Sequence, residues 1–252
     1  MTKMLNEPMP VKTECSACPL RLMSRFREFE DAELEFISEF KAGELAVQPG
    51  TGILEEGSNS PHLFTVLSGW AFRYKSLSDG SRQILNFALP GDFLGLQASV
   101  FDMMDHSVEA LTDVTLCVFP RDKVWTLFRQ HPSLAHDLTW LATAEERVLG
   151  AHLTAVGQRS APARIAFLLL HLYERCEPMN LAGGDKLLVP FTQAHLADVL
   201  GLSLVHTNKS IRKLTSNELL RWDKGLVTFL DRPKLMDMAE MSDATPAKRP
   251  FI

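Results

Sequence analysis

A stretch near the end of the chain has residue types that start and interrupt helices, at the spacing of two short helices. Thr192 can cap a helix that runs to about residue 200, and Ser203 can cap a second helix that runs to about residue 216. Gly201 separates the two helices. A hairpin is predicted around Gly225, so the order is that of a helix-turn-helix followed by a hairpin.

The second of these predicted helices has an apolar face and a polar, basic face. Thr207, Ile211 and Leu214 recur at spacings of 4 and 3 and therefore face inward. The opposite face holds polar or basic residues and one valine: Val205, Asn208, Lys209 and Arg212. Lysine can contact phosphate or guanine, and asparagine can form two hydrogen bonds with adenine. Such a face suits the major groove of DNA.

We therefore predict that double-stranded DNA binds to this segment. The predicted contacts are the caps, residues close to them and the outward face: Thr192, Gln193, Ser203, Val205, His206, Asn208, Lys209 and Arg212. The alternative is an ordinary helical hairpin with a solvated basic face. The hairpin, the caps and the local charge favour DNA, because residues 190–234 hold seven bases and four acids in a chain whose net charge is −5.

Three cysteines form a second candidate site. Cys15 and Cys18 are close in sequence, and Cys117 is a distant third. Thiolates in this pattern are suited to an iron–sulfur cluster or to zinc. The alternative is that Cys15 and Cys18 are free thiols and that Cys117 is a buried strand residue. The fourth cysteine, Cys176, lies outside the pattern and is expected to pack in an apolar helix.

The first half of the chain has the pattern of short strands. Eight of the fourteen glycines lie between Gly43 and Gly95, and they separate short runs that contain β-branched or aromatic residues. Such spacing predicts an all-β domain, a sandwich or barrel, over about residues 40–120. Asp79-Gly80 is a good hairpin turn within it.

A helical stripe follows the predicted strands, from about Pro132 to Val156. Its apolar residues recur at helical spacing: Leu134, Leu138, Leu141 and Val148. A long, narrow apolar seam on a helix often forms a dimer interface, and we predict that role for these four residues. The alternative is a helix that lies on the β-domain of its own chain.

Several classes of protein are excluded. The histidines are scattered, and no Ser/His/Asp or phosphate-loop signature is present, so we do not expect an enzyme. The longest uninterrupted apolar run is Ile165 to Leu170, too short for a bilayer. The N-terminus has no apolar signal region, so we expect a cytoplasmic protein that does not enter a membrane.

Both halves of the chain resemble the Crp/Fnr superfamily of bacterial transcription regulators. The C-terminal half resembles its winged helix-turn-helix through Phe191-Thr192-Gln193 and the run 196–203, Leu-Ala-Asp-Val-Leu-Gly-Leu-Ser. The N-terminal half resembles its β-roll effector domain through the run 64–70, Phe-Thr-Val-Leu-Ser-Gly-Trp, and through Leu89-Pro90-Gly91-Asp92-Phe93-Leu94-Gly95. The likeness covers about Cys15 to Leu230.

The resemblance implies an α+β chain with an N-terminal β-roll (cyclic-nucleotide-binding-like) domain, a long dimerisation helix and a C-terminal winged helix-turn-helix. The expected ranges are 20–125 for the β-roll, 126–157 for the dimerisation helix, 158–235 for the DNA-binding domain and 241–252 for a disordered tail. It also implies a homodimer that binds a two-fold symmetric operator and works with RNA polymerase.

Two departures from the family bear on the effector. Members that bind cyclic AMP have a Gly-Glu-Leu run and an Arg-Ser pair that holds the cyclic phosphate. Here those places read Gly91-Asp92-Phe93 and His106-Ser107, without the arginine, so we do not predict a cyclic nucleotide. Fnr-type members hold a [4Fe–4S] cluster, and Cys15, Cys18 and Cys117 resemble three of its ligands. The next expected cysteine falls at Ser24, a poor ligand, and Glu14 or an outside group would have to complete the site.

The sequence thus predicts a homodimeric, DNA-binding transcriptional regulator of the Fnr-like branch, with no cofactor and with its signal sensed in the β-roll. One alternative is an iron–sulfur-dependent oxygen or redox sensor on the same scaffold. A second is a β-roll regulatory subunit that acts on a protein partner. The effector, the target promoters and the direction of regulation are not encoded in any motif of the sequence.

Overall fold

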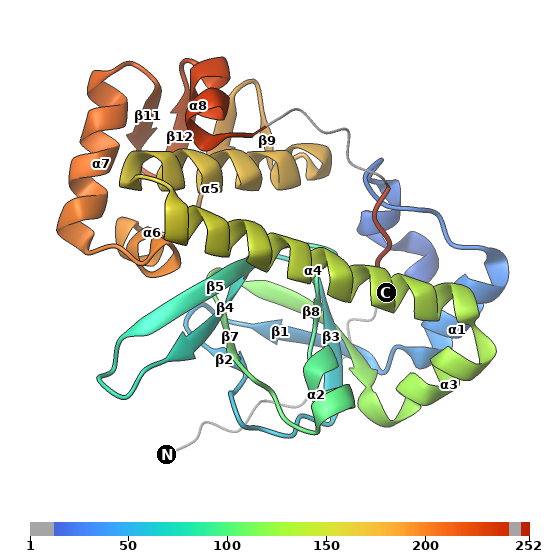
Figure 1. Cartoon of the computed structure of the whole chain (residues 1–252). Coiled ribbons are helices and arrows are strands. Elements are labelled where there is room, and N and C mark those ends of the chain that lie inside the picture. Colours follow the sequence, from blue (N-terminus) through green and yellow to red (C-terminus); the bar gives the residue numbers. More distant parts are fainter. Residues whose placement is uncertain (1–12, 242–247) are drawn as a thin grey trace. The chain divides into compact units, whose positions relative to one another are not determined.

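The computed structural model describes residues 13–241 and 248–252, and it divides the chain into two compact units (Figure 1). The first unit comprises the residues up to 73, 87–143 and 248–252. The second unit comprises 74–86 and 144–247. The division passes through two strands and one long helix, so these elements contribute to both units.

The first unit is built mainly from two four-stranded sheets. One sheet has the order β1-β8-β3-β6 and the other β2-β7-β4-β5. The strands are β1 (Gly43–Val47), β2 (Gly52–Leu54), β3 (His62–Ser68), β4 (Ala71–Ser76), β5 (Arg82–Ala88), β6 (Phe93–Leu94), β7 (Ser107–Ala110) and β8 (Val114–Pro120). The central pairs β1–β8 and β3–β8 are antiparallel, with Leu45 opposite Leu116 and Thr65 opposite Cys117. The strands predicted over about 40–120 are confirmed, but the segment is not all-β, because the helix α2 (Leu96–Phe101) lies within it.

The core of this unit is contributed by strands of both sheets. Phe64, Val66 and Leu116 of one sheet are buried with Ile53 and Val108 of the other in a single apolar cluster. Burial of this apolar surface is the main favourable contribution to the stability of the unit. The helices around the sheets are η1 (Cys15–Ala17), η2 (Pro19–Leu22), α1 (Asp31–Phe40), α2 (Leu96–Phe101), η3 (Arg121–Lys123) and α3 (Val124–Gln130).

The second unit is mostly helical and ends in a small sheet. After the long helix α4 (Pro132–Gln158) come α5 (Ala161–Cys176), η4 (Glu177–Met179), β9 (Ala182–Gly183), β10 (Lys186–Leu188), α6 (Gln193–Leu200), α7 (Leu204–Ser216), β11 (Leu220–Asp223), β12 (Leu226–Phe229) and α8 (Arg232–Ala239). The sheet has the order β11-β12-β10-β9. Most of α5 is buried, and α6, α7 and α8 all contact it. It is therefore the centre of this unit.

Helix α4 covers the predicted range, but its apolar stripe faces its own chain. Leu134, Leu138 and Leu141 are buried within a single chain, and only 1% of Leu138 is exposed. Val148 is half-buried. A side chain that is already buried in one chain has no surface left for a partner, so the prediction of a dimer seam is wrong for the three leucines. Their burial agrees with the alternative prediction, in which the helix packs on the β-domain of its own chain.

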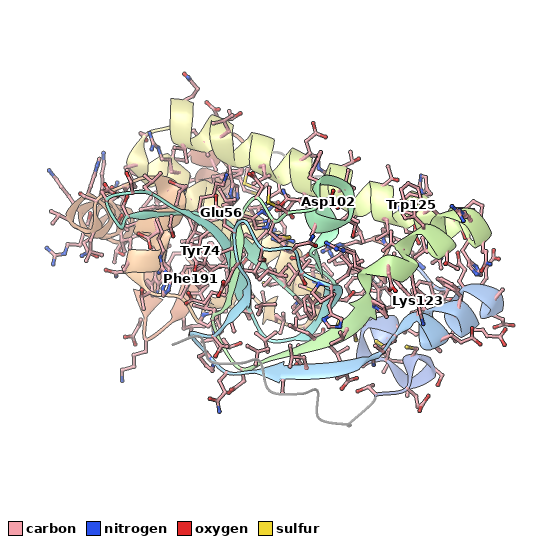
Figure 2. All side chains as sticks on the ribbon, turned by 90° about the horizontal axis from the view of Figure 1, so that it is seen from below. Glu56, Tyr74, Asp102, Lys123, Trp125 and Phe191 are labelled. Carbon is pink, nitrogen blue, oxygen red and sulfur yellow. The ribbon has the colours of Figure 1, made fainter. Side chains whose placement is uncertain are left out.

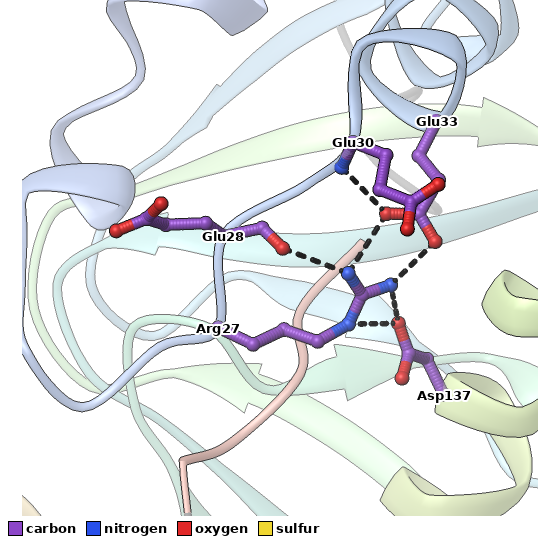
Figure 3. Close-up of polar contacts among 5 residues, drawn as sticks. All are labelled: Arg27, Glu28, Glu30, Glu33 and Asp137. Carbon is purple, nitrogen blue, oxygen red and sulfur yellow. Dashed lines mark hydrogen bonds and ion pairs between the residues drawn. The ribbon is translucent and has the colours of Figure 1, made fainter.

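An arginine-centred cluster fixes the first half of α4 within the first unit (Figure 3). Arg27 donates hydrogen bonds to both carboxylate oxygens of Glu33 on α1, at 2.8 and 3.0 Å. The same guanidinium donates to the Asp137 carboxylate of α4, with 2.7 Å between Nε and Oδ2. Burial opposes ionisation of Glu33, but the hydrogen bonds and charge of Arg27, together with hydrogen bonds from Ser133 and the backbone of Glu30, outweigh it and lower the pKa of Glu33 to about 2. A bidentate pair shared by two acids is a strong tie between α1 and α4.

The prediction of a disordered tail over 241–252 is wrong for residues 248–252. Residues 242–247 lie outside the described residues. Residues 248–252 are packed on the first unit, and Phe251 and Ile252 are buried there. Their apolar side chains and a short stretch of backbone pairing hold them, neither of which the composition of the tail indicated.

None of the helices in the described part of the chain combines the length and the apolar character that a membrane span requires.

Candidate nucleic-acid interface

The two helices of the predicted helix-turn-helix begin at the predicted caps. Thr192 precedes α6, and its hydroxyl accepts a hydrogen bond from the backbone N–H of His195. Ser203 precedes α7, and its Oγ accepts from the N–H of His206 at 3.2 Å. Each cap satisfies a backbone donor that the first helical turn leaves unpaired. Both predictions of the helix starts are confirmed.

The turn between the helices depends on glycine. Gly201 ends α6 with φ +61°, a conformation that costs glycine little and other residues more. The N–H of Leu202 then donates to the carbonyl of Ala197 at 3.1 Å, which closes the end of α6. Arg164 of α5 donates to the carbonyl of Leu200 at 3.1 Å and adds a positive charge at the negative end of α6.

The inward face of α7 is the predicted one. Thr207, Ile211 and Leu214 are buried, and α7 packs against α5 and α6. The Thr207 hydroxyl donates to the carbonyl of Ser203 at 3.1 Å, so this buried polar group is satisfied inside the helix. The rotation of α7 about its axis is therefore fixed by its packing.

The outward face of α7 presents the predicted polar and basic side chains to solvent. Val205, Lys209 and Arg212 are exposed, Val205 by 79%. Asn208 is half-buried and lies between them in the sequence. His206 is exposed at the first turn, and Gln193 is half-buried at the start of α6. The predicted DNA-contacting residues thus lie on α7 or at the starts of the two helices.

A hairpin follows α7, as predicted. Strands β11 and β12 are antiparallel with Trp222 opposite Val227, and the turn between them holds Lys224 and Gly225 at positive φ. The Trp222 ring meets the Phe191 ring edge to face at 5.9 Å, which joins the hairpin to the start of the helix-turn-helix (Figure 2, where Phe191 is labelled). Arg221 and Lys224 are exposed, so the hairpin carries positive charge beside α7.

One contact of this unit was missed by sequence reasoning. The hairpin of residues 74–86, between β4 and β5, contacts α6. Arg82 Nε lies 2.8 Å from Asp198 Oδ2, and Gln83 Nε2 donates to the carbonyl of Val199 at 2.9 Å. Both pairs are 116 residues apart in sequence, so no local pattern could show them. The charge of Arg82, together with burial, lowers the pKa of His195.

The three cysteines of the second candidate site line one apolar pocket in the first unit. Burial raises the pKa of the Cys117 thiol to about 12 and also raises that of Cys18. Lys41 lines the same pocket, and its Nζ is 2.7 Å from Glu44 Oε1. Residue 24, where the family's next cysteine is expected, is a serine, and Glu14 is exposed.

These residues do not fit a metal centre. Within residues 13–241 and 248–252, no three histidine, cysteine, aspartate or glutamate side chains are placed so that they could hold a metal ion. Thiols whose pKa is raised by burial are poor ligands, because a metal binds the thiolate. The prediction of a cluster on Cys15, Cys18 and Cys117 is therefore corrected to a group of thiols around one pocket.

The two segments that depart from the family pattern, Gly91-Asp92-Phe93 and His106-Ser107, make contacts within the chain. Asp92 accepts a hydrogen bond from the N–H of Leu89 at 2.8 Å, and its other oxygen is paired with Arg249. The Ser107 hydroxyl accepts from the N–H of Glu56 at 3.0 Å, and His106 is half-buried beside it. Asp92 and Ser107 are thus engaged by the chain itself.

Comparison with known protein families assigns both halves of the chain. Residues 44–131 match the family of cyclic nucleotide-binding domains. Residues 163–238 match the family of Crp-like helix-turn-helix domains. This matched segment includes α6, α7 and the β11–β12 hairpin. The whole of α4 lies between the two matched segments.

Individual relatives share this organisation over nearly their whole length. The nitrogen fixation regulation protein FixK of Bradyrhizobium diazoefficiens is 30% identical over 226 residues, which are 89% of this chain and 93% of that protein. The transcriptional activator protein FnrL of Cereibacter sphaeroides is 24% identical over 93% of this chain and 95% of its own. The solved structure of FixK2 from Bradyrhizobium japonicum superposes with a TM-score of 0.71 at 25% identity, covering 80% of this chain and 98% of that one.

The geometry and these relatives agree. A capped helix-turn-helix presents a polar face, the relatives are transcription regulators and not enzymes, and such regulators bind DNA and act as dimers. The chain belongs to the Crp/Fnr family of transcription regulators.

Proposed function

We propose that a dimer of this chain binds a two-fold symmetric operator and that α7 reads each half-site from the major groove. The proposal rests on the outward face of α7. Its polar and basic side chains are exposed, and the buried residues on the opposite face fix the rotation of the helix about its axis. A recognition helix needs both features, since base contacts depend on a defined orientation.

Individual residues on this face would have different tasks. Lys209 is exposed at the middle of the face and would contact a guanine edge, and Asn208 would contact adenine. Val205 cannot accept a hydrogen bond, but it can pack on a thymine methyl group. The Fnr-type members that this chain resembles have Glu and Arg at the positions of Val205 and Lys209. The half-site that this chain prefers would therefore differ from theirs.

The remaining candidates would contact the phosphate backbone. Arg212 lies further along α7, and Gln193 and His206 lie at the first turns of the two helices. Ser203 already accepts a hydrogen bond as a cap, but its hydroxyl keeps a proton that it can donate to a phosphate oxygen. The Thr192 hydroxyl also lies 2.8 Å from His195 Nδ1, so Thr192 would have to exchange this contact for a phosphate. Helix N-termini add favourable positive potential at the same place.

The dimer contact would use the exposed face of α4. Its exposed residues recur at spacings of 3, 4, 3 and 4: Thr139, Ala142, Glu146, Leu149 and Leu153. Leu149 and Leu153 are 38% and 73% exposed, so this face leaves apolar surface that a partner helix could cover. Small residues such as Ala142 allow two helices to approach closely, and the 3.5-residue period is that of a coiled coil.

Regulation would begin in the first unit. A signal sensed there would shift the population between two arrangements of the dimer, of which one spaces the recognition helices for DNA. We expect that the signal is not cyclic AMP, because His106 replaces the arginine and Asp92 and Ser107 are engaged by the chain itself. A regulator of this kind would contact RNA polymerase and act in the cytoplasm, where its DNA lies.

The two alternatives have less support. The donor set does not fit a cluster, so no observation favours an iron–sulfur-dependent sensor. A regulatory subunit for a protein partner would not need an exposed basic face on a capped helix-turn-helix, and the relatives are DNA-binding regulators.

Selection of bound sequences from random DNA, with the purified full chain, tests the proposal. We expect enriched sites with two-fold symmetry and half-sites about one helical turn apart, on the order of 34 Å. The matched control is the triple variant Val205→Ala, Lys209→Ala, Arg212→Ala, which should fold but enrich nothing. Enriched sites without symmetry, or the same enrichment by the control variant, would contradict the proposal.

A further inference from the structure

The last five residues of the chain, Lys248–Ile252, lie on the first unit, although the preceding helix α8 belongs to the second. Their backbone pairs with the segment after η2. The N–H of Arg249 donates to the carbonyl of Arg25 at 2.7 Å, and the N–H of Arg27 donates to the carbonyl of Arg249 at 2.9 Å. Such pairing resembles the way an extended peptide adds to a strand-like backbone.

Two side chains of the segment, those of Phe251 and Arg249, are held by the first unit. The Phe251 ring lies 5.0 Å from the Phe26 ring and 4.8 Å from the Phe29 ring, and only 4% of Phe251 is exposed. Arg249 Nη2 lies 2.5 Å from Asp92 Oδ1, and both side chains are largely buried. A buried carboxylate and a buried guanidinium are both costly unless they are paired, so each of these groups needs the other.

The end of the segment reaches the pocket of the cysteines. Phe251 and Ile252 line the same pocket as Cys15, Cys18 and Cys117. The Thr65 hydroxyl donates to the carbonyl of Ile252, and Thr65 stands opposite Cys117 in the β3–β8 pair. Ile252 is therefore part of the wall of this pocket, beside the buried Cys117.

We propose that Lys248–Ile252 is a latch that binds a groove of the first unit and closes the cysteine pocket. The groove is formed by the backbone of residues 25–27, the rings of Phe26 and Phe29, and the Asp92 carboxylate. Cys117 is buried, whereas Cys15 and Cys18 are half-buried, so access of thiol reagents to Cys117 requires release of the latch.

The rate of alkylation of each cysteine in the native protein tests this proposal. N-ethylmaleimide is added to the full chain and to a chain that ends at residue 247, and each cysteine is followed by mass spectrometry. We expect that the truncation increases the rate at the buried Cys117 by about tenfold or more, because a reagent then reaches this thiol without a prior local opening of the protein. The rate at Cys18 should rise less, because this residue is only half-buried in the full chain. Cys176, which is buried in α5 of the second unit, serves as the internal control and should not change.

Point variants and a peptide separate the latch from a general loss of stability. Phe251→Ala should behave like the truncation, whereas Lys248→Ala, at the exposed start of the segment, should leave all rates unchanged. A synthetic peptide of the last five residues should restore protection to the truncated chain, and the same peptide with alanine in place of phenylalanine should not. Equal rates in the full and truncated chains, or a rise at Cys176 equal to that at Cys117, would overturn the proposal.

Discussion

Helices α7 and α4 both carry an apolar stripe at spacings of 3 and 4, yet they use it differently. The stripe of α7 faces the helices of its own unit and leaves a polar face outward, as expected. The stripe of α4 was expected to face a partner, but Leu134, Leu138 and Leu141 are buried in their own chain. The apolar residues that α4 leaves exposed, Leu149 and Leu153, lie off that stripe.

The comparison shows what periodicity determines. A stripe of apolar residues indicates which face of a helix is buried, because apolar surface is removed from water wherever it is placed. It does not indicate what buries that face. For α7 the main neighbours are α5 and α6, which precede it in the same unit, whereas for α4 they include Arg27, which is 110 residues away from Asp137.

The largest expected effect separates the two faces of α4. Leu138→Asp would bury an unpaired charge in the first unit, so we expect a loss of stability of about 4 kcal/mol or more, or failure to fold. Leu153→Asp lies on the exposed face and should change the stability of the folded chain little, while it converts the dimer to monomers. Thermal unfolding and sedimentation of both variants check this. If Leu138→Asp gives a folded monomer, Leu138 would belong to the dimer interface after all, and the conclusion drawn from its burial would be wrong.

The second effect concerns the ion cluster on the buried side of α4. Arg27→Met leaves Glu33 and Asp137 without their partner, and we expect a loss of about 2–4 kcal/mol of unfolding free energy at pH 7. Urea unfolding measures this loss, and Arg129→Met on the exposed side of α3 is the matched control. A cost as small as that of the control would show that the cluster contributes little.

The pH dependence of the same variant follows from the pKa of Glu33. Its pKa is about 2 in the folded chain and 4.5 for the ordinary group, so its contribution is present above about pH 4.5 and is lost as the pH falls toward 2. The difference in stability between the wild type and Arg27→Met should therefore narrow over this range of pH. A difference that stays constant down to pH 2 would contradict the assignment of the shift to Arg27.

The third effect tests the outward face of α7. Lys209→Ala should weaken binding to the preferred DNA sequence by about 1–3 kcal/mol if Lys209 contacts a base. Arg212→Ala should weaken binding to all sequences about equally and lower the slope of log K against log salt by about 1. Titrations with preferred and random DNA at several salt concentrations measure both. An equal loss on both kinds of DNA for Lys209→Ala would make Lys209 a phosphate contact and leave sequence preference to Val205 and Asn208.

The smallest effect tests the start of α7. Ser203→Ala removes the acceptor for the N–H of His206 and should lower the free energy of unfolding by about 1 kcal/mol. The preferred DNA sequence should remain the same, because Ser203 caps the helix and contacts no base. Thr215→Ala, at an exposed position in the last turn, is the control for stability. A changed sequence preference for Ser203→Ala would assign it a role in base recognition.

The sequence by itself determined the parts of the protein whose causes are local. Thr192, Ser203 and Gly201 start and end helices through contacts within four residues, and the alternation of glycines with short strand-forming runs marks the β-domain. The outward face of α7 follows from the spacing of its buried residues. The candidate DNA-contacting face was therefore predicted at the level of single residues.

Only the tertiary structure decided which distant segments meet. It brought Arg82 to Asp198, Arg27 to Asp137 and the C-terminal Phe251 to Phe26. It also placed the three cysteines around one pocket without the arrangement that a metal ion requires. Contacts of this kind depend on how the whole chain closes its loops and fills its core. They leave no periodic signal in the residues on either side, so the stripe of α4 could not reveal its partner.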